Sequence, residues 1–103
     1  MKLYTNQDQT AKLIELGFPE SETSRNYDLD VDKSLVNCAY SIGELIEFLP
    51  RWIKFKGGIE MVAERDGWLV MHGHDPFDPY CKNAELIDAL FEYCVKLKED
   101  GVI

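Results

Sequence analysis

One long amphipathic segment near the C-terminus, residues 83–101, most strongly limits what this chain can fold into. Its apolar residues recur every three or four positions, which is the spacing of a helix with one buried side. Asn83 is a competent N-cap, and Gly101 stands where a left-handed C-cap would end the helix. The apolar arc is wider than a surface helix needs, so we expect other elements to pack around it. The arc comprises Leu86, Ile87, Leu90, Phe91, Cys94 and Leu97.

Length and composition indicate a single globular domain over residues 1–103. Of these residues, 46% are hydrophobic and 29% are charged, as is usual for folded domains. No apolar run approaches the ~18 residues of a transmembrane helix, and the N-terminus turns polar too soon for a signal peptide. The cysteines, Cys38, Cys81 and Cys94, are odd in number and lack CxxC spacing, which favours reduced thiols. We therefore expect a cytoplasmic protein without a membrane partner.

The chain is acidic, with 19 acidic against 11 basic residues and a net charge of −8. Such a surface repels a phosphate backbone on average, and no stripe of lysine and arginine overturns that average. We therefore expect no direct binding of nucleic acid and interpret the acidity as a solvated surface. The alternative is an acidic mimic of nucleic acid that occupies a DNA-binding protein.

Two further helices, over residues 5–16 and 41–49, are predicted from their start and stop signals. The second begins with a capping box formed by Ser41 and Glu44, and it ends before Pro50. The first has two alternative starts of the capping kind and an expected Schellman ending. These signals are Thr5-x-x-Asp8, Asn6-x-x-Gln9 and Gly17-Phe-Pro19.

Three strands are predicted. Residues 26–32 alternate strictly between apolar and polar side chains, as in a half-buried strand. A hairpin follows the second helix, and its Asp66-Gly67 turn would place Ala63 opposite Val70. We do not expect residues 52–56 to form a further strand. The inner face of the hairpin is predicted to carry Ile59, Met61, Ala63, Trp68, Val70 and His72, while the other face is only partly polar because it carries Val62, Leu69 and Met71.

The order of elements is helix, strand, helix, two strands and helix. This order predicts an α+β domain of two layers, in which a three-stranded antiparallel sheet packs against three helices. Residues 72–81, rich in proline and glycine, are expected to form a loop that leads to the last helix.

Three stretches of the chain, residues 17–23, 40–50 and 86–103, have a recognisable order of features. They resemble a group of small proteins of unknown function that are common in gut Bacteroidetes genomes, often near prophages or other mobile elements. In that group a PxET segment, a WSI/LxxLLxLLP helix and a DAxxEMxxxLxExxxI terminal helix recur in this order. The resemblance implies a bacterial, phage-related accessory protein, and it carries over no catalytic residue.

One loop carries residues that are able to ligate a metal. Alternate histidines place both imidazoles on one side, and carboxylates and a thiolate follow them. Because the spacing is permissive and no distant ligand is evident, we expect neither a metal nor another cofactor there. The alternative is a small metal-dependent enzyme built on the loop from His72 to Cys81. The candidate ligands are His72, His74, Asp75, Asp78 and Cys81.

No residue is assigned a catalytic role. Cys94 falls in the apolar stripe of the last helix, where a thiol acts as a small hydrophobic group. The sequence contains neither a phosphate-binding loop nor a dinucleotide fingerprint. The leading hypothesis is therefore an accessory protein that works by binding another protein without catalysis. Trp52 and an acidic ridge on the last helix, formed by Glu85, Asp88 and Glu92, are the candidate partner-binding residues.

Overall fold

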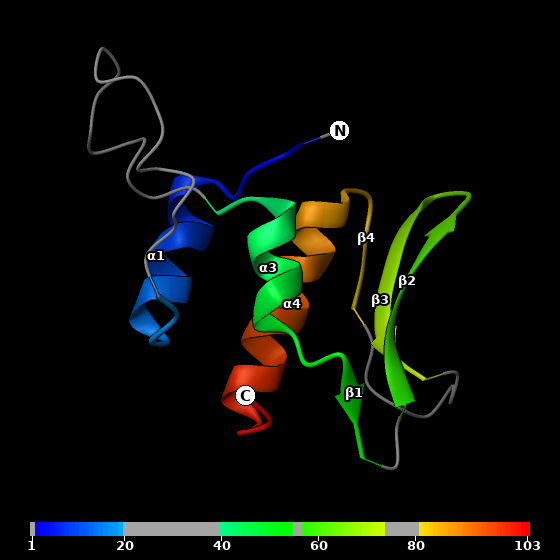
Figure 1. The fold of residues 1–103 in the computed structure, drawn as a ribbon. Helices are drawn as coiled ribbons and strands as arrows, with labels where there is room; N and C mark the ends of the chain where they lie inside the picture. The colour runs from blue at the N-terminus through cyan, green and yellow to red at the C-terminus, as the bar shows by residue number, and fades with distance from the viewer. Residues whose placement is uncertain (1, 20–39, 55–56, 74–80) are drawn as a thin grey trace.

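The computed structural model describes residues 2–19, 40–54, 57–73 and 81–103 (Figure 1). The predicted strand over residues 26–32, together with Cys38, His74, Asp75 and Asp78, lies outside the described residues. The elements in chain order are α1 (Gln7–Glu15), α3 (Ile42–Phe48), β1 (Trp52–Ile53), β2 (Gly57–Glu64), β3 (Gly67–His72), β4 (Cys81–Asn83) and α4 (Leu86–Glu99).

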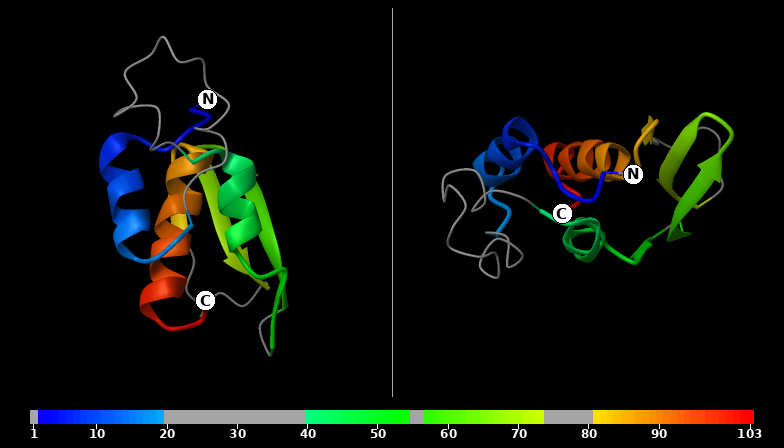
Figure 2. Two further views of the ribbon diagram at one scale, coloured as in Figure 1. Left: turned by 60° about the vertical axis from the view of Figure 1, so that its left-hand side comes forward. Right: turned by 90° about the horizontal axis from the view of Figure 1, so that it is seen from above.

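Helix α4 lies at the centre of the fold, as its wide apolar arc predicts. It packs against α3 and against strands β3 and β4, and α1 lies on the side of α4 away from the sheet (Figure 2). Leu90 and Cys94, in the middle of α4, are fully buried, as are Leu13, Leu45 and Val70 from the surrounding elements. The α+β class is therefore confirmed. The sheet with α3 and α4 forms the two predicted layers, whereas α1 stands beyond them.

Caps begin and end the first two helices where the sequence indicates. In α1 the second of the two alternative starts is the real one, because Asn6 Oδ1 accepts from the Gln9 N–H at 2.8 Å and Gln9 Oε1 accepts from the Asn6 N–H at 3.0 Å. Ser41 and Glu44 form the same reciprocal pair at the start of α3. α1 ends in the predicted Schellman motif, in which the Phe18 N–H donates to the Leu13 carbonyl oxygen at 3.1 Å.

Helix α4 begins two residues later than predicted. Its N-cap is Glu85, whose side chain makes no capping bond, while Asn83 belongs to β4. The Asn83 side chain accepts from the Glu85 N–H at 3.4 Å, so it holds the turn before the helix instead of capping it. The end of α4 is as predicted: Gly101 has a φ of 76°, and the following N–H bonds to Leu97 O at 2.9 Å.

The sheet has four antiparallel strands in the order β1-β2-β3-β4, so the prediction of three strands is wrong. Strand β1 lies within residues 52–56, where we expected none, and β4 runs from the end of the predicted loop to the predicted N-cap of the last helix. β1 has two residues and β4 has three, which is too short for an alternating pattern to show. Each is a strand because a longer neighbour pairs with it, and that pairing is not written in the segment itself.

The β2–β3 hairpin has the predicted faces but a different register. Ala63 pairs with Trp68, two positions before its predicted partner, and the turn lies one residue earlier than the predicted Asp66-Gly67. Because the partner changes by two residues, every side chain keeps its face. Gly67 is required within β3, since a Cβ there would lie 2.5 Å from the Asn83 carbonyl oxygen. Gly67 suggested a turn in the sequence, but its lack of a side chain is needed because β4 passes so close to it.

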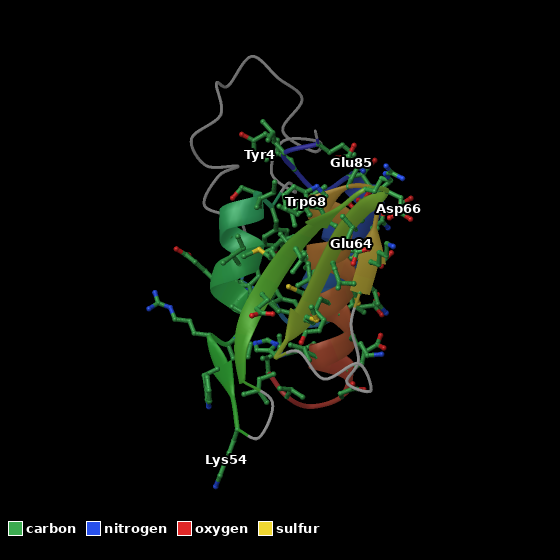
Figure 3. All side chains as sticks on the ribbon, turned by 90° about the vertical axis from the view of Figure 1, so that its right-hand side faces the viewer. Tyr4, Lys54, Glu64, Asp66, Trp68 and Glu85 are labelled. Carbon is green, nitrogen blue, oxygen red and sulfur yellow. The ribbon has the colours of Figure 1, made fainter. Side chains whose placement is uncertain are left out.

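The two faces of the sheet differ in their surroundings. On the inner face, under α4, Val70 and His72 are buried, with exposed fractions of 0% and 1%. Met61 and Ala63 share that face, but they lie on β2, farther from α4, and they are exposed. In Figure 3 the outer face is turned toward the viewer, and none of the described helices lies in front of it. Among the described residues, this outer face is therefore the side of the sheet that no helix covers.

Candidate functional site

Trp52 is the most exposed large apolar side chain of the described residues, with 68% of its surface accessible. It lies on β1 opposite Gly58, and a Cβ on that glycine would be 3.8 Å from Trp52 Cε3. The indole ring therefore lies close to the β2 backbone, at an ordinary van der Waals distance from the position that a Cβ at residue 58 would take. A contact of this kind holds the ring on the sheet surface while most of it stays open to solvent.

Trp52 shares the outer face of the sheet with three other apolar residues. Its partner Gly58 and the residues Val62, Leu69 and Met71 follow the same alternation across β2 and β3. Val62 is 37% exposed, and the other two are half-buried. We call these four residues, Trp52, Val62, Leu69 and Met71, the outer apolar patch. Its residues are apolar on a face that no described element covers, and such patches often mark an interaction site.

Charged side chains border the outer apolar patch, and Glu60 lies within it, opposite Met71. At the β2–β3 turn, Lys82 Nζ lies 3.0 Å from Glu64 Oε2 and 3.1 Å from Asp66 Oδ1. The hydrogen bond from Lys82 lowers the pKa of Asp66, and the hydrogen bonds to both carboxylates raise the pKa of Lys82. At the other end Arg51 is exposed beside Trp52, and Lys54 extends away from the body of the molecule (Figure 3). The border is therefore basic near Trp52 and mixed in charge at the turn.

The predicted acidic ridge on α4 is engaged by the chain's own residues. Asp88 accepts from Lys2 Nζ at 3.1 Å and from Gln9 Nε2 at 2.7 Å. Glu85 accepts from the Lys2 backbone N–H at 3.1 Å, and Glu92 accepts from an asparagine of β4 at 3.1 Å. These carboxylates fasten the N-terminal residues and β4 to α4, so a basic partner would compete with existing contacts there.

His72 lies within the core, and both of its ring nitrogens have partners. Nε2 is 2.6 Å from the Pro50 carbonyl oxygen, and Nδ1 is 2.5 Å from the Tyr93 hydroxyl. Because a carbonyl oxygen only accepts, Nε2 carries the proton, and Nδ1 accepts from the hydroxyl. A metal bound to His72 would have to displace one of these partners, and His74, Asp75 and Asp78 lie outside the described residues.

The two described cysteines are Cys81, which is half-buried on β4, and Cys94, which is buried on α4. Burial raises the pKa of Cys81, and the nearby Glu92 carboxylate adds to this effect. Burial raises the pKa of Cys94 to about 12, and its thiol donates to the Leu45 carbonyl oxygen at 3.6 Å. Both thiols therefore stay protonated near neutral pH, which is the wrong state for a nucleophile.

The sequence indicated part of this surface and missed the rest. It identified Trp52 as a candidate partner-binding residue, and it showed that the second face of the hairpin is not fully polar. It did not show that β1 ends after two residues, so that along most of β2 the structure describes no neighbouring strand on that side. The length of a paired strand depends on where two segments meet, and no local signal in residues 52–56 records it.

The described parts of the chain offer few other functional features. Within them, no helix has both the length and the apolar character needed to span a bilayer, and no cluster of His, Cys, Asp or Glu side chains is arranged to hold a metal ion. Comparison of the chain with family models, curated proteins and solved structures gives no significant match.

Proposed function

We propose that this chain is an accessory protein that binds another protein through the outer apolar patch, without catalysis. The observation that carries the proposal is the exposure of Trp52, 68% of which is open to solvent on an uncovered face of the sheet. Tryptophan is among the residues that contribute most to binding at protein interfaces. The resemblance to phage- and mobile-element-associated proteins supports a role in such a programme in the bacterial cytoplasm.

The outer apolar patch suits a partner better than the acidic ridge does. Binding at the patch would remove the indole ring, Val62 and the neighbouring apolar groups from water, which is favourable in proportion to the area buried. Binding at Glu85, Asp88 and Glu92 would instead have to replace contacts of 2.7–3.1 Å that the chain already makes. We therefore assign the ridge a secondary role, as a region that a basic part of the partner reaches after the patch has docked.

Site-specific photo-crosslinking in the native host tests this proposal. A photoreactive phenylalanine analogue placed at Val62 on the outer face should give a discrete adduct with a partner protein. The matched control is Ile14, which is 44% exposed and belongs to α1, the helix on the side of α4 away from the sheet (Figure 2). Trp52→Ala should abolish the Val62 adduct. The variant itself should stay within about 0.5 kcal/mol of wild-type stability, because the side chain is largely exposed.

Two results would contradict the proposal. One is the same set of adducts from Val62 and from Ile14, because this would show contact without a specific surface. The other is a Val62 adduct that persists in full when Trp52 is replaced, because the indole ring would then not be the anchor.

A further inference from the structure

Over most of its length, the long strand β2 has an edge along which the structure describes no neighbouring strand. β2 runs from Gly57 to Glu64, but β1 pairs only with Gly57 and Gly58. Beyond that point no described strand lies along this side of β2, which is the outermost long strand of the sheet in Figure 1. Met61 is 36% exposed and Ala63 is also exposed, so the side chains along this edge are open to solvent.

The backbone groups at this edge are identified by the alternation of the sheet. The Gly58 carbonyl oxygen accepts from the Gly73 N–H at 3.0 Å, so the even-numbered residues of β2 direct their backbone N–H and C=O groups toward β3. The Ile59 N–H donates to the Arg51 carbonyl oxygen at 3.0 Å, so the odd-numbered residues direct their backbone N–H and C=O groups away from β3. Met61 and Ala63 therefore direct their N–H and C=O groups outward, along an edge that is ready to pair with another strand.

We propose that the edge of β2 from Glu60 to Glu64 binds an extended segment of the partner protein as an added antiparallel strand. This inference rests on the proposed function and specifies how the partner is bound. Its backbone would exchange hydrogen bonds with Met61 and Ala63, as in other cases where a peptide extends a sheet. The antiparallel direction follows the existing sheet, in which every strand pair is antiparallel.

The side chains of β2 specify the chemistry of that segment. Glu60 and Glu64 lie on the outer face with Val62 between them, and they lie roughly 13 Å apart along the strand. Basic residues opposite the two glutamates would make favourable cross-strand pairs. Glu64 already lies 3.0 Å from Lys82 Nζ, so a basic residue opposite it would share that carboxylate with Lys82. Apolar residues between them would cover Met61, Val62 and Ala63. The segment is therefore a run of three largely apolar residues with a lysine or arginine at each end.

A second copy of this chain fits the same edge poorly. Antiparallel pairing of β2 with itself, with Met61 opposite the partner copy's Ala63, would place Glu60 opposite the other copy's Glu64, and like charges directly opposite each other are destabilising. Moving the register to place Met61 opposite itself would bring the second strand against Ile59, whose N–H already donates to the Arg51 carbonyl oxygen. In these two registers the edge favours a different, basic segment over a second copy.

Peptide binding to the intact protein tests this inference. The probe is the acetylated and amidated peptide Lys-Val-Thr-Val-Lys, and binding is followed by NMR of the backbone amides. We expect the largest shifts at Met61 and Ala63, with slowed hydrogen exchange at both. Replacing both lysines by glutamate should weaken binding by about fivefold or more at low salt, and added salt should reduce the difference.

Two methylated peptides decide whether the backbone pairs as proposed. N-methylation of both valines removes the donors that face β2 and should weaken binding by at least about tenfold. N-methylation of the threonine alters an amide that faces solvent and should leave affinity within about twofold. The reverse order would overturn the proposed register, and equal effects would overturn strand addition altogether.

The remaining outcomes separate this inference from the proposed function. If the lysine and glutamate peptides bind equally, the inferred partner chemistry is wrong. If Met61 and Ala63 become protected only as protein concentration rises and a dimer forms, the occupant is a second copy. If the Val62 adduct forms in the host but no peptide shifts Met61 or Ala63, the proposed function stands and the added strand does not.

Discussion

Replacing Tyr93 with phenylalanine removes one hydroxyl from the core and is expected to destabilise the protein. The hydroxyl donates to His72 Nδ1 at 2.5 Å, and the two residues have exposed fractions of 2% and 1%. Because Nε2 is committed to the Pro50 carbonyl, Nδ1 has to accept, and without the hydroxyl it would be a buried acceptor that has lost its donor. The aromatic ring stays in place, so little cavity is created.

The expected loss in the free energy of unfolding is about 1–3 kcal/mol, the usual cost of leaving a buried polar atom unsatisfied. A domain of this size has roughly 5–15 kcal/mol in total, so the effect should be plain in urea-induced unfolding. In thermal unfolding each kcal/mol should lower Tm by about 4–8 °C.

The control is the same Tyr93→Phe substitution made in a His72→Leu variant. In that variant the imidazole is absent, so the Tyr93 hydroxyl no longer has His72 Nδ1 as an acceptor. Adding Tyr93→Phe there should therefore cost clearly less than it does in the wild-type background. A wild-type-like midpoint for Tyr93→Phe alone, or an equal loss in both backgrounds, would refute the assigned hydrogen bond.

Three further predictions concern a cap, a close contact and a titration. Ser41→Ala should cost about 0.5–2 kcal/mol by removing the N-cap acceptor of α3, and an unchanged melting curve would contradict that role. Gly67→Ala should cost about 1–3 kcal/mol, because its Cβ would meet the Asn83 carbonyl oxygen at 2.5 Å; urea unfolding that matches wild type would show that β4 does not pass so close. Cys94, whose pKa is raised to about 12 by burial, keeps a proton in the folded chain that the unfolded chain loses above about pH 8.5. Stability should therefore fall as pH rises from about 8.5 to 12, and the fall should be smaller in Cys94→Ala; equal slopes for the two proteins would sink this assignment.

Features that depend on residues close together in the chain were predictable from sequence. The capping pairs Asn6–Gln9 and Ser41–Glu44 each join residues three apart, so the local sequence contains both partners. The central position of α4 also follows from its own apolar arc. The faces of the β2–β3 hairpin were right because alternation is insensitive to a change of two residues in the partner.

Features that depend on distant segments were not predictable. Gly67 looked like a turn residue, but its lack of a side chain serves the passage of Asn83, which is 16 positions later in the sequence. Asn83 looked like a helix cap because asparagine suits both caps and turns. The exposed Trp52 was identifiable as a candidate, whereas the free edge at Met61 exists only because β1 ends after pairing with two glycines.

The position of α4 has a consequence for how the protein folds during synthesis. α1, α3 and the β2–β3 hairpin all precede α4 in the chain, yet Leu13, Leu45 and Val70 reach their buried positions only in the cluster that includes its residues. Until α4 has left the ribosome, these apolar side chains have no core to enter, and the hairpin has an unprotected edge. We expect nascent chains that stop before Leu86 to remain unfolded and to be bound by chaperones, and folding to occur as a single late step once α4 emerges.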